Sequence, residues 1–162
     1  MDTQLIKQIT EMLNKLPNSI CRINNSIDEG WIAAGESEFN LKLPEYYRWF
    51  IKNYDSITLW GELIKTVFPP EYRDDADQDI FYTYNWNINY NKDNHDKLFF
   101  LEVNDIGFFY FKVINNKANE EVYCFDLSTG NHDLYAENFL DFLKIEMVLY
   151  SNPFKIELLE II

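Results

Sequence analysis

The chain has 162 residues, with 14 lysines and arginines against 27 aspartates and glutamates, and its net charge is −13. Only three residues are arginine, and a surface that binds phosphates needs clustered basic residues, so the composition argues against direct nucleic-acid binding. An acidic chain instead attracts a basic protein partner, although the same charge could serve solubility alone. The length suits one domain spanning residues 1–162.

No segment indicates export or a membrane span. The start, MDTQLIKQITEML, is broken by polar residues and lacks a basic beginning followed by an apolar run. We therefore expect a cytoplasmic protein that does not bind membranes. Cys21 and Cys124 are expected to be buried thiols, with a disulfide between them as the open alternative.

Hydrophobic spacing predicts helices over Asp2–Leu16, Asp28–Phe39 and Pro44–Tyr54. In the third helix, the buried stripe at i, i+3, i+4 and i+7 is Tyr47, Phe50, Ile51 and Tyr54. Tyr46 and Trp49 fall outside that stripe. They either pack beneath the first helix or contact a protein partner.

Beyond the third helix the pattern changes to strands and loops. Residues 57–64 (ITLWGELI) predict a strand with a turn or bulge at Gly61, and residues 68–79 predict a loop. Residues 81–90 alternate aromatic and polar side chains, which predicts a strand. A short helix remains the alternative for this segment, because Phe81, Tyr84 and Ile88 also have helical spacing.

The last third predicts four short strands, at 97–103, 107–113, 121–127 and 132–136, separated by turn-like segments. A helix follows in residues 136–150, and the tail 152–162 is expected to add a further helix or strand. Short links favour an antiparallel meander. The predicted fold class is therefore α+β, with N-terminal helices packed on a curved antiparallel sheet and a C-terminal helix.

The sequence contains none of the common catalytic motifs. The only histidines are His95 and His132, each beside an aspartate, and a zinc site would have to recruit them with Cys21 or Cys124 from distant elements, so we expect no metal and no cofactor. Asp75, Asp77 and Asp79 imitate the start of a calcium-binding loop, but Ile80 replaces the glycine and Trp86 the glutamate that such a loop requires. A weak enzyme alternative is a cleft near Cys124 and His132, which could lie on adjacent strands.

The loop before residue 80 concentrates negative charge. It is either a solvated surface turn or an acidic element that recognises a partner. The candidate partner-binding residues are five loop carboxylates and two rings of the third helix: Glu71, Asp74, Asp75, Asp77, Asp79, Trp49 and Tyr46.

The ordered pattern of the chain resembles the SUKH superfamily, the yeast cell-wall-synthesis-regulator-like immunity domain, over about Asp28–Lys144. The resemblance is carried by LKLPEYYRWFIKNYDS, by Gly61 in TLWGEL, by Gly107 in FFLEVNDIGFFYFKV, by EVYCFDLSTGN and by YAENFLDFL. The chain departs from the family in three places. Asp55-Ser56 replaces an Asn-Gly turn, the acidic loop has no counterpart, and the family often has a short helix near residues 81–90.

The resemblance implies a function that the motifs do not. Bacterial members are similar to immunity proteins that bind and neutralise a cognate toxin, commonly one that attacks nucleic acids, without catalytic residues of their own. A non-catalytic regulatory scaffold of the same fold is the alternative, as in eukaryotic members.

Overall fold

The computed structural model describes residues 1–17, 21–22, 27–54, 56–75 and 77–154. The helices within these residues are α1 (Thr3–Leu13), α2 (Glu29–Glu38), α3 (Glu45–Asn53), the 3-10 helix η1 (Pro70–Asp75), α4 (Ile80–Tyr90), the 3-10 helix η2 (Lys92–Asn94) and α5 (Phe139–Phe154). The strands are β1 (Cys21–Arg22), β2 (Ser56–Leu59), β3 (Glu62–Leu63), β4 (Lys97–Val103), β5 (Gly107–Ile114), β6 (Lys117–Asp126) and β7 (His132–Ala136). Most of the predicted tail, residues 155–162, lies outside the described residues.

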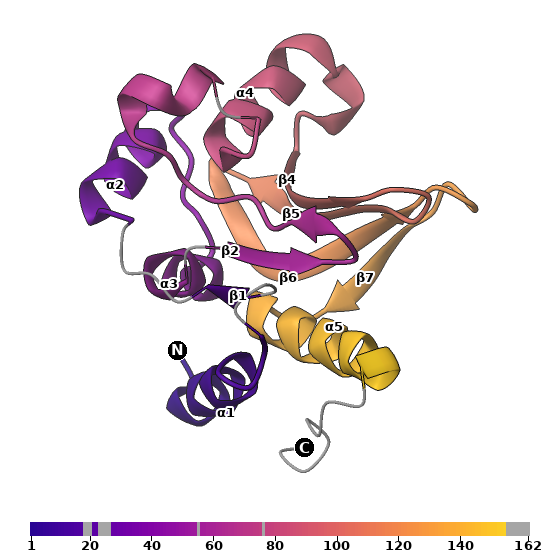
Figure 1. The fold of residues 1–162 in the computed structure, drawn as a ribbon. Coiled ribbons are helices and arrows are strands. Elements are labelled where there is room, and N and C mark those ends of the chain that lie inside the picture. Colours follow the sequence, from indigo (N-terminus) through magenta and orange to yellow (C-terminus); the bar gives the residue numbers. More distant parts are fainter. Residues whose placement is uncertain (18–20, 23–26, 55, 76, 155–162) are drawn as a thin grey trace.

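The strands form two antiparallel sheets, ordered β1-β2-β3 and β4-β5-β6-β7. The larger sheet bends strongly, and irregular pairing interrupts each of its three strand pairs (Figure 1). Gly107 stands where β5 approaches β6, and a Cβ there would lie 1.8 Å from the Phe125 carbonyl oxygen. The predicted α+β class and the antiparallel meander are confirmed.

Side-chain caps confirm the predicted starts of the first two helices, whereas the third helix starts one residue later than predicted. The Asp2 carboxylate accepts hydrogen bonds from the backbone N–H groups of Gln4 and Leu5, at 2.8 and 3.2 Å. Asp28 caps α2 in the same way. Pro44 precedes α3 as its cap residue, so Glu45 and not Pro44 is the first helical residue.

The turn predicted at Gly61 is a two-residue hairpin between β2 and β3. Trp60 and Gly61 both have positive φ, 57° and 87°. Two successive residues with positive φ match the twist of an antiparallel hairpin, and the second one is glycine, which adopts this conformation at little cost.

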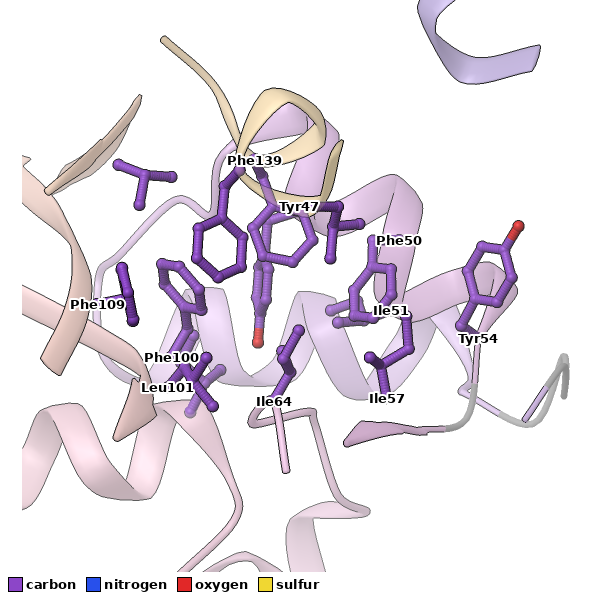
Figure 2. Close-up of a cluster of buried hydrophobic side chains, with 14 of the residues drawn as sticks. Tyr47, Phe50, Ile51, Tyr54, Ile57, Ile64, Phe100, Leu101, Phe109 and Phe139 are labelled. Atoms are coloured by element: carbon purple, nitrogen blue, oxygen red, sulfur yellow. The ribbon is translucent and has the colours of Figure 1, made fainter. Parts of the chain in front are cut away.

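Several of the aromatic rings of α3 belong to the hydrophobic core. Tyr47 and Phe50 are buried and lie among rings from the sheet and from α5, including Phe100 and Phe139 (Figure 2). The Tyr47 hydroxyl donates a 2.6 Å hydrogen bond to the Lys65 carbonyl oxygen, so the buried polar tip is satisfied. All four residues of the predicted stripe are buried, so that prediction is confirmed.

The strand predicted for residues 81–90 is wrong, because the segment is the helix α4. Its buried residues, Ile80, Phe81, Tyr84 and Asn87, have helical spacing. Over a short segment, alternating aromatic and polar residues can match both the two-residue period of a strand and the 3.6-residue period of a helix. Packing of α4 against β4, together with a helix cap at Asp79, decides in favour of the helix.

The helices are divided between two ends of the molecule. α1 and α5 lie together at one end, whereas α4 lies at the other end, beyond the large sheet (Figure 1). η1 contacts both α2 and α4 and therefore belongs to the α4 end.

Candidate functional site

The acidic segment predicted as a loop leads from β3 into α4 and contains η1. Glu71, Asp74 and Asp77 are exposed, and none of the ion pairs between described residues involves them. The backbone of Asp75 belongs to η1, while its side chain lies outside the described part of the chain. Three carboxylates of this segment are thus exposed and form no ion pair with another described residue, although the Lys65 ammonium bonds to the Asp77 carbonyl oxygen at 2.8 Å.

Asp79 has a different place, which corrects its assignment as a partner-binding residue. Its side chain is fully buried and caps α4. One carboxylate oxygen accepts from the N–H groups of Phe81 and Tyr82, at 2.8 and 2.9 Å, and the other accepts from the N–H of Phe68 at 2.8 Å. Burial raises the pKa of Asp79, while these hydrogen bonds and Arg73 oppose the rise. Asp79 is therefore part of the support of the segment and is not available to a partner.

Arg73 anchors the acidic segment to the rest of the molecule. Only 2% of this residue is exposed, and its guanidinium bonds to the Glu38 carboxylate on α2. The guanidinium also lies over the rings of Phe39 and Phe81, 5.8 and 5.4 Å from their centroids. Arg73 is thus held by an ion pair and by two rings, and it joins η1 to α2 and α4.

Tyr46 and Trp49 lie away from the acidic segment. The Tyr46 hydroxyl accepts a 2.8 Å hydrogen bond from the Asp2 N–H at the start of α1, which supports the packing interpretation of this ring. Trp49 is half-buried, meets the Tyr54 ring edge-on with centroids 5.8 Å apart, and lines a pocket that includes Met1. Since α1 and α4 lie at opposite ends, the structure does not bring these two rings together with the carboxylates (Figure 1).

Cys124 and His132 lie on adjacent strands but do not form a catalytic pair. Cys124 is opposite Asp133 and His132 is opposite Phe125, so the thiol and the imidazole point to different faces of the sheet. Burial raises the pKa of the Cys124 thiol to about 11, which keeps it protonated and unreactive at neutral pH. The His132 ring stacks on Phe125 at 4.6 Å and its Nδ1 lies 2.9 Å from the Tyr110 hydroxyl.

In the part of the chain that the structure describes, no group of three or more histidine, cysteine, aspartate or glutamate side chains is arranged to hold a metal ion. None of the described helices is both long enough and apolar enough to cross a membrane.

The sequence pattern missed one feature of the α4 end. Trp86 and Tyr90 are 50% and 75% exposed, and their ring centroids lie 5.6 Å apart. Read as a strand, this segment places Tyr84 on the same side as both rings, whereas in the helix Tyr84 is buried and they face outward. The available signal was Asp79, an aspartate directly before a run with helical spacing.

Comparison with protein families gives one result. The model described as SUKH_6, SMI1-KNR4 cell-wall, matches residues 29–143. The match runs from α2 into α5, covers more than two thirds of the chain and includes the acidic segment and α4. No curated protein matches the chain.

Proposed function

We propose a function from one premise: the chain belongs to the SUKH superfamily, which includes immunity proteins. We propose that it is a cytoplasmic immunity protein, which binds a cognate toxin that attacks nucleic acids and blocks it without chemistry of its own. Tight binding alone suffices for this function, because a toxin is neutralised once its active cleft is covered.

The observation that carries the proposal is the exposed charge of the acidic segment, which forms no ion pair with the described residues. Glu71, Asp74 and Asp77 point to solvent, while Arg73 and Asp79 hold the backbone beneath them. A toxin that acts on nucleic acid has a basic cleft, and an acidic inhibitor is attracted to that cleft over long range. The net charge of −13 acts in the same direction.

The decisive experiment is protection of living cells. A toxin domain encoded directly upstream of this chain is expressed from an inducible promoter, with and without the chain. The proposal expects growth to be restored by the chain and lost again when Glu71→Gln, Asp74→Asn and Asp77→Asn are combined. Leu134→Ala, an exposed residue on β7, is the matched control and should protect like the parent. Equal killing with and without the parent chain contradicts the proposal and favours the regulatory scaffold.

A further inference from the structure

The outer face of α4 carries a stripe of aromatic rings that the fold does not use. Tyr82, Trp86 and Tyr90 follow one another at i, i+4 and i+8, on the side away from the buried face. Tyr82 is half-buried, Trp86 and Tyr90 are exposed, and the last two rings touch. On η1, which contacts α4, Tyr72 is 60% exposed.

These rings are not explained by helix stability. Asparagines and aromatic residues make up most of α4, and both types are weak helix formers. The helix is held instead by the Asp79 cap and by its buried face. Trp and Tyr at exposed positions therefore add little to folding, while they are the residue types that contribute most to protein interfaces.

Carboxylates precede and follow α4 in the chain. Residues 70–96 contain seven carboxylates and two basic residues, and one of each, Asp79 and Arg73, is buried. Glu71, Asp74 and Asp77 are exposed on the N-terminal side of α4, and Asp93 is exposed just after its C-terminal end. Exposed carboxylates at both ends of an aromatic helix repel phosphates and attract cations, and the faces of Trp and Tyr rings bind arginine and lysine side chains directly.

We propose that the outer face of α4, together with the exposed carboxylates of the preceding segment, is the docking surface for a basic protein. Arginine and lysine side chains of that protein lie on the Trp86 and Tyr90 rings and pair with those carboxylates. The inference rests on the proposed function for the identity of the partner as the toxin, and it adds where on the chain the toxin binds.

The first test measures binding to the purified toxin domain encoded directly upstream. The variant combines Trp86→Ala and Tyr90→Ala, and Leu134→Ala is the control because its exposed fraction, 52%, is close to that of Trp86. Far-ultraviolet circular dichroism establishes that each variant is folded. The double variant should raise the dissociation constant by about thirtyfold or more, whereas the control should stay within about twofold. A double variant that binds like the parent overturns the surface, while the proposed function stands.

A second test separates the two proposals if the parent chain does not bind that toxin domain. A photo-crosslinking amino acid, p-benzoylphenylalanine, replaces Tyr90 in one variant and Leu134 in another, and each full chain is irradiated in the cells of origin. The inference expects a crosslink specific to position 90, and the crosslinked peptide should come from a protein with a net positive charge. Absence of a crosslink at position 90, or one to an acidic protein, overturns the docking surface.

Discussion

Replacing Gly35 with alanine should destabilise the protein, the opposite of what helix propensity predicts. A Cβ at this position in α2 would lie 2.3 and 2.4 Å from two ring carbons of Phe81 on α4. Phe81 is fully buried and held between Phe39 and Arg73, so it has little room to move. Overpacking lowers the free energy of unfolding by about 1–3 kcal/mol, whereas replacing glycine with alanine in a helix interior raises it by about 0.5–1 kcal/mol. The free energy of unfolding should therefore fall, by up to about 2.5 kcal/mol.

Urea unfolding followed by far-ultraviolet circular dichroism measures this change. The midpoint of Gly35→Ala should fall while the slope with urea stays the same. The same substitution in a Phe81→Leu background tests the contact directly, because the smaller side chain should remove most of the penalty. A rise in the midpoint for the single variant would mean that α2 and α4 do not pack through these two residues, and the placement of the α4 surface would be wrong.

Three further predictions concern single side chains. Phe50→Ala should lower the free energy of unfolding in urea by about 3–5 kcal/mol, because the ring is buried among other rings. Trp49→Ala should lower it less, because Trp49 is only half-buried. The reverse order would show that the buried stripe of α3 lies on a different face of the helix. Asp79→Ala should cost about 2–4 kcal/mol through the lost cap and the orphaned N–H of residue 68, whereas the exposed Asp74→Ala should stay within about 0.5 kcal/mol. Cys124 should react with a thiol reagent far more slowly at pH 8 in the folded chain than in urea, since its pKa is about 11; equal rates would refute the burial.

Local patterns were enough to predict most of the fold. Aspartates 2 and 28 mark helix starts because their short side chains reach the first free N–H groups, and the structure shows both caps. The strands from 97 to 136 are apolar runs joined by short turn-like links, and short links favour antiparallel neighbours. These signals depend on residues close in sequence, which is why they could be read without the structure.

Features that depend on contacts between residues far apart in the chain could not be predicted from the sequence. The five carboxylates of residues 71–79 are chemically alike in sequence, and only the N–H groups of Phe68, Phe81 and Tyr82 distinguish the buried Asp79 from its neighbours. The suggested pair of Cys124 and His132 failed for a similar reason. Adjacent strands can be predicted from sequence, but a shift of one residue in their register moves a side chain to the other face.

The most direct test of the proposed function is a titration of toxin activity. The protein encoded directly upstream is purified and mixed with increasing amounts of the chain, and attack on nucleic acid is measured at low and at high salt. We expect activity to fall to zero near one molar equivalent. We also expect the variant with Glu71→Gln, Asp74→Asn and Asp77→Asn to inhibit more weakly at low salt, with a smaller difference at high salt. Full toxin activity in the presence of excess parent chain would contradict the proposed function.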